Sequence, residues 1–175
     1  MKKDPRITAP RMRASHVERT IVNYLAPRTG RNLVVPNVAW GWGLNFEADL
    51  VVVTGAQYAW EIEIKVRKDD LIKDNGKRKW RGTVHFERFR RFYYAIPEEL
   101  EADTRELGRE EAGIFIIKGR ECLLARNPVE RKQARKVTTA ERLKLAELGA
   151  VRVWDLKEVL YMQNSWAGED EQRGT

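Results

Sequence analysis

The chain has 175 residues, 42% of them hydrophobic, and a net charge of +7, which suits one domain with a sizeable core. No apolar run approaches the roughly 20 residues of a membrane span, and no signal peptide follows the basic amino terminus, so we expect a cytoplasmic protein without membrane attachment. A single cysteine excludes an internal disulfide, and two histidines leave too few soft ligands for structural zinc. Any metal would be bound through oxygen.

Basic residues are concentrated in three segments, residues 1–31, 65–91 and 126–144, whereas residues 98–111 are mainly acidic. Basic segments around an acidic cluster are what a protein needs to hold phosphates near a metal site, and they indicate a polyanionic partner such as DNA. An ordinary solvated basic surface gives the same pattern, so charge alone leaves both interpretations open.

The amino-terminal part predicts a flexible basic arm over residues 1–13, followed by a helix. Ser15 and Glu18 form a capping-box pattern, and apolar residues recur at helical spacing as far as Pro27. Glu18 therefore has a structural explanation, although a carboxylate here could also reach a metal in the sheet. Residues 32–42, which contain Pro36, are typical of an edge strand.

Residues 48–66 predict two strands joined by a short turn, at the centre of the sheet. Because strand side chains alternate between faces, Glu61, Glu63 and Lys65 share one face and apolar residues occupy the other. The preceding strand is almost wholly apolar but carries Asp49, and a lone buried carboxylate costs several kcal/mol unless a cation satisfies it. The alternative without a functional role is a solvated face of the sheet, on which these acids and the lysine pair with one another.

Residues 68–79 predict a loop beside this hairpin, because they are charged and show little core periodicity. Residues 85–92 place aromatic side chains at helical spacing, most simply as core, before a short strand over residues 93–96. The basic side chains of these two segments are the candidates for phosphate contacts. They are Lys77, Arg78, Lys79, Arg88 and Arg91.

The carboxyl-terminal third predicts a helix over residues 98–111 and a hairpin over residues 112–125. Thr138 and Glu141 repeat the capping-box pattern and open a helix that we expect to end at Gly149. A short strand over residues 151–153 and a last helix over residues 155–163 follow. The domain organisation is therefore an arm (1–13), one domain (14–166) and a disordered tail (167–175).

Asp49 on one strand, followed fourteen residues later by Glu63-Ile64-Lys65 on the next, resembles the motif of the PD-(D/E)XK nuclease superfamily. Within it, residues 48–100 are most similar to the MmcB-like DNA repair nucleases. The shared features are an Ala-Asp-apolar strand, a Glu-Ile-Lys strand, a Lys-Trp pair and an aromatic strand ending in proline. In this chain they are Ala48-Asp49-Leu50, Glu63-Ile64-Lys65, Lys79-Trp80 and residues 92–97.

The resemblance implies an α/β fold, a restriction-endonuclease-like core with a central mixed β-sheet flanked by α-helices. It also implies that Asp49, Glu63 and the backbone carbonyl of Ile64 hold Mg²⁺ or Mn²⁺, while Lys65 orients the attacking water. Carboxylate and carbonyl oxygens are ligands that suit these metals. Glu61 and Glu18 are auxiliary carboxylates outside the motif. Glu61 either holds a second metal or simply pairs with a nearby base such as Lys79.

The function that follows is a metal-dependent nuclease that cleaves DNA phosphodiester bonds in repair or recombination. The alternative is a nucleic-acid-binding protein with a degenerate, non-catalytic nuclease fold, and a third class is a protein-interaction scaffold. The form of the DNA, a preference for RNA and the oligomeric state, a homodimer included, stay open at this point.

Overall fold

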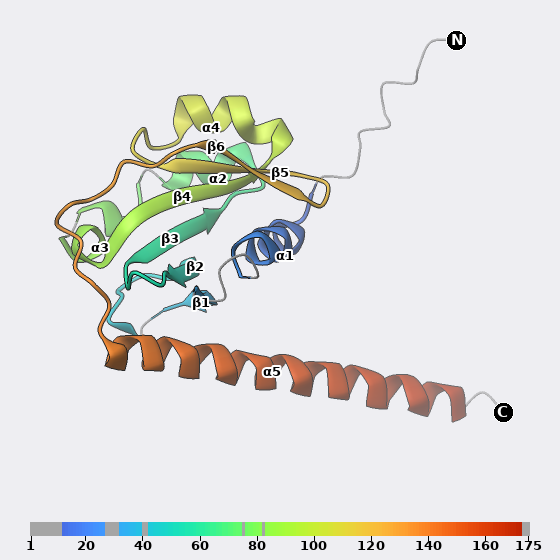
Figure 1. Ribbon diagram of the computed structural model, residues 1–175. Coiled ribbons are helices and arrows are strands. Elements are labelled where there is room, and N and C mark those ends of the chain that lie inside the picture. The colour runs from blue at the N-terminus through green and yellow to red at the C-terminus, as the bar shows by residue number, and fades with distance from the viewer. Residues whose placement is uncertain (1–11, 27–31, 40–41, 75, 82, 173–175) are drawn as a thin grey trace, which may run out of the picture.

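The structure is a computed structural model that describes residues 12–26, 32–39, 42–74, 76–81 and 83–172, without the side chains of Arg78, Thr83 and residues 161–172. A six-stranded mixed sheet with the order β1-β2-β3-β4-β5-β6 is flanked by helices (Figure 1), as the expected α/β class requires. The strands are β1 Leu33–Val38, β2 Ala48–Val53, β3 Ala59–Ile64, β4 Phe89–Pro97, β5 Gly113–Lys118 and β6 Glu121–Arg126. The helices are α1 Ala14–Leu25, α2 Lys68–Asp74, α3 Thr83–Arg88, α4 Glu101–Leu107 and α5 Thr139–Gln172, with 3₁₀ turns η2 Arg78–Arg81 and η3 Glu98–Leu100.

The predicted central hairpin is confirmed: β2 and β3 are antiparallel, with Leu50 opposite Ile62. Strand β1 pairs with β2 at one edge of the sheet, which suits its Pro36. Strands β3, β4 and β5 run parallel through crossovers, and β5 and β6 form the predicted second hairpin. The hairpin turn contains Gly119 at φ +57°, a conformation that glycine adopts without steric cost.

The two faces of the sheet are covered by different elements. Helix α1 buries Val17, Ile21 and Leu25 against one face, on apolar side chains from β2 to β5. The other face carries two apolar clusters, one where α5 and the segment before β2 pack on β1 and β2, and one beneath α2 and η3. The charged residues described below lie on this second face.

The predicted loop over residues 68–79 is wrong, because its first part is helix α2. Leu71 and Asp74 are both fully buried, and their spacing of three residues places them on one side of a helix. The helix is too short for the helical spacing of apolar residues to repeat, so its packing depends on a single apolar side chain, Leu71. The charged residues around Leu71 conceal the pattern in the sequence.

The predicted helix over residues 85–92 is also wrong in its second half, since β4 begins at Phe89. Phe89 pairs with Ala59 and Arg91 pairs with Trp60, which leaves Arg90 as an extra residue in a bulge. The bulge turns Phe89 and Phe92 to the same face of the sheet. Their spacing of three residues, which imitates a helix, arises from this irregular strand, and both rings are core as expected.

The carboxyl-terminal prediction is right at its start and wrong after it. The backbone N–H groups of Thr138 and Glu141 each bond the other residue's side chain, at 2.9 and 3.2 Å, so the capping box is formed. The helix then continues through Gly149 to Gln172, in place of the expected stop, strand, second helix and tail from residue 167. Gly149 lies against Val35, where a β-carbon would meet both methyl groups at 3.7 Å, so it marks a close approach to β1.

The amino-terminal capping prediction is wrong: α1 starts at Ala14, and Arg13 at its N-cap makes no side-chain capping bond. Ser15 is already inside the helix. Most of the predicted arm, residues 1–11, and the last three residues of the predicted tail lie outside the described residues. Over the part of the chain that is described, no helix is both long and apolar enough to cross a membrane.

Candidate functional site

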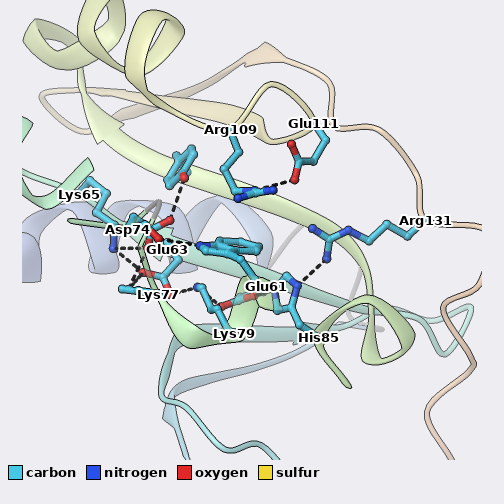
Figure 2. Close-up of polar contacts among 12 residues, drawn as sticks. Glu61, Glu63, Lys65, Asp74, Lys77, Lys79, His85, Arg109, Glu111 and Arg131 are labelled. Atoms are coloured by element: carbon cyan, nitrogen blue, oxygen red, sulfur yellow. Dashed lines mark hydrogen bonds and ion pairs between the residues drawn. The ribbon is translucent and has the colours of Figure 1, made fainter. Parts of the chain in front are cut away.

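Glu61 and Glu63 of β3 are fully buried on the sheet face opposite α1. Glu61 lies beside Phe92 of the neighbouring strand, and Glu63 lies beside Tyr94. The alternation of β3 thus directs two carboxylates into the protein interior, where each needs cationic partners. These partners come from the residue that follows β3, from the segment after α2 and from α3 (Figure 2).

Glu63 is surrounded by three lysine ammonium groups. Lys65 and Lys79 bond its two carboxylate oxygens, and Lys77 Nζ lies 2.9 Å from Oε2. Burial alone would raise the pKa of Glu63, but the three positive charges outweigh burial and hold it well below its usual value. Glu63 is therefore ionised throughout the physiological range.

Glu61 is held by Lys79 at 2.7 Å and by Nε2 of His85. Arg131 Nη1 lies 2.9 Å from the other ring nitrogen, Nδ1. Because arginine can only donate, Nδ1 must accept, and Nε2 then carries the proton that is donated to Glu61. Burial lowers the pKa of His85 although Glu61 opposes this, so the ring stays neutral.

Asp74, at the end of α2, is the third buried carboxylate of this group. Its Oδ2 accepts a hydrogen bond of 2.8 Å from the hydroxyl of Tyr94. Its Oδ1 lies 2.9 Å from Lys77 Nζ and 3.7 Å from Lys65 Nζ. Burial, followed by the charge and bond of Asp74, raises the pKa of Tyr94, so this hydroxyl remains a donor.

Asp49 of β2 is mostly buried at the edge of the same group. Its Oδ2 accepts a hydrogen bond of 2.7 Å from the backbone N–H of Ile64. Burial and the negative charge of Glu63 raise the pKa of Asp49 to about 6, against the opposing effects of the Ile64 N–H, Lys65 and Lys77. The structure therefore brings Asp49, Glu63 and Lys65 together, as the motif requires.

Glu18 is the predicted auxiliary carboxylate that lies away from this group. It belongs to α1, which covers the opposite face of the sheet. Burial raises the pKa of Glu18, and the positive charge of Arg152 on α5 partly offsets this. Glu18 does not take part in a capping bond at the start of α1. It also cannot join Glu61 and Glu63, because the β-sheet lies between α1 and these residues.

The predicted phosphate-binding residues do not form one surface. Lys79 is 3% exposed and is enclosed by the rings of Phe46, Trp80 and Phe92, so it cannot contact DNA directly. Arg91 shares a register position with Trp60, on the sheet face opposite Glu61, and bonds Glu130. Arg88 stacks on Trp42 and pairs with Glu141. The side chain of Lys77 is 40% exposed, and that of Arg78 is not described.

Four members of the group were missed from the sequence: Asp74, Tyr94, His85 and Arg131. Asp74 could have been found by placing it with Leu71 on one side of a short helix. Tyr94 lies in the strand that pairs with β3, at the position beside Glu63. His85 and Arg131 carry no local signal, because a contact across 46 residues depends on the tertiary fold.

The type of side chain fits a divalent cation, but the arrangement is not that of an assembled metal site. Asp49 and Glu63 are hard oxygen ligands, and the raised pKa of Asp49 reflects a repulsion from Glu63 that a cation would relieve. Among the residues that the structure describes, no three Asp, Glu, His or Cys side chains converge on one point. Lysine ammonium groups lie between the carboxylates instead (Figure 2).

Comparisons with known proteins bear on the fold only. No family model matches the sequence, and no curated protein matches it. The structure is similar to that of the SPO1766 protein of unknown function from Silicibacter pomeroyi, with a TM-score of 0.59 and 21% sequence identity. The similarity covers 86% of this chain and 92% of that chain. It agrees with a mixed sheet flanked by helices and says nothing of chemistry.

Proposed function

We propose that this protein is a metal-dependent nuclease with a restriction-endonuclease-like fold, and that it hydrolyses DNA phosphodiester bonds. The observation that carries the proposal is the convergence of Asp49, Glu63 and Lys65. Two adjacent antiparallel strands supply Asp49 and Glu63, and Lys65 directly follows the second strand. Asp49 is close enough to the other two for its pKa to respond to both charges. A raised carboxylate pKa beside a buried lysine is typical of a functional site.

The oxygen ligands of Asp49 and Glu63 are of the type that suits Mg²⁺ or Mn²⁺. Asp49 and Glu63 would hold the cation with the carbonyl oxygen of Ile64, and the cation would supply Lewis-acid polarisation of the scissile phosphate. Asp49 would bind in its ionised form, which positive charge favours.

Lys65 is the residue for which the geometry supports a direct chemical role. Its ammonium group is buried, bonds Glu63 and lies 3.7 Å from Asp74. Held there, it would orient the attacking water and stabilise the negative charge that grows on the phosphate. Lys79, Glu61 and His85 would keep Glu63 in position, since they form the bonded chain behind it.

One observation favours the second candidate, a DNA-binding protein whose site no longer cleaves. Three lysines already balance Glu61, Glu63 and Asp74, so the buried group is electrically satisfied without a metal. A nucleic-acid-binding protein would keep the basic charge and its salt-dependent affinity for DNA, but it would not need a cation.

The two candidates are separated by a cleavage assay with purified full-length protein. Supercoiled, linear, single-stranded and branched DNA are each incubated with Mg²⁺ or Mn²⁺, beside an EDTA control. We expect metal-dependent cleavage by the wild type and a rate at least ~100-fold lower for Asp49→Ala and for Lys65→Ala, with DNA affinity kept. Asp69→Ala and Lys73→Ala, which alter exposed side chains of α2, are the matched controls and should cut like the wild type.

Binding of every substrate without cleavage of any, in either metal, would select the second candidate. Cleavage by Asp49→Ala at the wild-type rate would mean that the reaction takes place elsewhere.

A further inference from the structure

Lys77 differs from the other two lysines at Glu63. Its side chain is 40% exposed, whereas those of Lys65 and Lys79 are 7% and 1% exposed. It follows α2 and precedes η2, outside any helix or strand. Lys77 is therefore the member of the group whose ammonium could move into water without exposing the core.

The ammonium of Lys77 lies between two carboxylates that come from different elements. It is 2.9 Å from Glu63 Oε2 and 2.9 Å from Asp74 Oδ1, and its charge also acts on Asp49. Two buried carboxylates thus face the position of one half-exposed cation. A lysine bonded in this way is a compact point charge, which a metal ion can replace.

Asp74 shows that the present occupant satisfies this position incompletely. The residue is fully buried, and its Oδ1 accepts no hydrogen bond with good geometry although two ammonium groups are near. Leaving a buried acceptor without a donor is unfavourable. A metal ion bonds a carboxylate oxygen without the directional requirement of an N–H donor.

We propose that the Lys77 ammonium marks the position of the divalent cation, and that Asp74 is a ligand beside Glu63. The inference rests on the proposed metal dependence and deepens it, since the sequence motif assigns no role to Asp74 or Lys77. Cation binding and the inward position of Lys77 exclude each other. Once displaced, Lys77 lies at the edge of the site, where a phosphate of the substrate is its natural partner.

The test measures Mn²⁺ binding to metal-free, full-length protein by isothermal titration calorimetry at pH 7.5, without DNA. Lys77→Met removes the competitor and should tighten Mn²⁺ binding at least ~5-fold, the lower end of typical coupling between two sites. Asp74→Asn removes a ligand charge and should weaken binding at least ~10-fold. Lys73→Met, an exposed lysine of α2, should stay within about twofold of the wild type.

Unchanged or weaker binding by Lys77→Met overturns the proposal, as does wild-type affinity in Asp74→Asn or the absence of Mn²⁺ binding in both wild type and Lys77→Met. Because Lys77 is half exposed, its variant tests the idea even if Asp74→Asn fails to fold, which circular dichroism would show. Cleavage by the wild type with no tighter binding in Lys77→Met would remove this inference and leave the nuclease function. Tighter Mn²⁺ binding in Lys77→Met without cleavage of any DNA would remove the nuclease function and leave the cation position.

Discussion

Strand β3 is buried on both faces, and different forces hold each face in place. On the α1 side, Ile62 packs among apolar side chains of α1 and the neighbouring strands, with Trp60 and Ile64 at its margins. On the other side, Glu61 and Glu63 are equally inaccessible to water but pair with lysines and a histidine. The same alternation of side chains produces an apolar layer on one face and an ionic layer on the other.

The ionic face of β3 contributes less to stability than its many bonds suggest. Burying an ion pair removes both charges from water, so an apolar replacement of similar volume is often as stable or more stable. Apolar packing on the α1 face therefore explains the fold, whereas the buried charges on the other face add little that apolar residues could not supply. The retention of several charges in one place is the expected mark of a functional site.

The largest effect that we expect comes from a minimal change on the ionic face. Glu61→Gln keeps the shape of the side chain but leaves His85 without a negative partner and leaves Lys79 with Glu63 as its remaining bonded carboxylate. We expect a loss of about 3 kcal/mol in the free energy of unfolding, at the lower end of values for broken buried ion pairs.

The matched change on the apolar face is Ile62→Val, which removes one methylene group and should cost about 0.5–1.5 kcal/mol. Urea denaturation followed by circular dichroism measures both variants against the wild type. An equal or smaller loss in Glu61→Gln would mean that the charges of this face are screened by water and that the two faces do not differ in the way described.

The sequence was sufficient for the part of the fold that depends on local alternation. The two hairpins, the edge strand and the facing of Glu61, Glu63 and Lys65 follow from a period of two. The helix starting after Thr138 follows from its capping box. In each case the signal lies within a few neighbouring residues.

The errors arose where a tertiary contact overrode the local signal. The spacing of Phe89 and Phe92 imitates a helix because of the bulge at Arg90. Gly149 lies inside a helix, at the point where β1 approaches it. Helix α2 depends on a single buried apolar side chain, Leu71.

The candidate site was predictable only in its strand residues. Asp49 and Glu63 come together because the turn lies midway between them, which sets Leu50 opposite Ile62, and Lys65 follows Glu63 on the same face. Asp74 and His85 join them through the crossover between β3 and β4, whose path no local pattern determines. That the ionic face is buried also could not be predicted, because alternating charges more often mark a solvated face.

A smaller effect is expected at Asp49, with a sign that depends on pH. Its native pKa is about 6, above the ordinary value of 3.8, so the folded protein binds a proton more tightly than the unfolded chain. The resulting stabilisation is present below about pH 4 and is lost as the pH rises through 6. Asp49→Asn removes this loss and keeps an acceptor for the Ile64 N–H.

We therefore expect Asp49→Asn to be more stable than the wild type by roughly 2 kcal/mol at pH 8, and by a negligible amount at pH 4. Urea denaturation at both pH values gives the comparison. A variant that is less stable than the wild type at pH 8 would show that attraction to the lysines outweighs burial, and Asp49 would then be an ordinary member of the ionic face.

The smallest effect should come from an ion pair that lies outside both faces. Arg105 bonds Glu101 at 2.8 and 2.9 Å on the exposed side of α4, one helical turn apart. Water solvates both ends of this pair, so Glu101→Ala should cost about 0.5 kcal/mol or less, and 1 M salt should remove most of that difference. The loss in Glu61→Gln should persist at the same salt concentration, because ions do not reach a buried pair. If Glu101→Ala were as harmful as Glu61→Gln, burial would not be what separates the two kinds of ion pair, and the ionic face of β3 would have no special standing as a site.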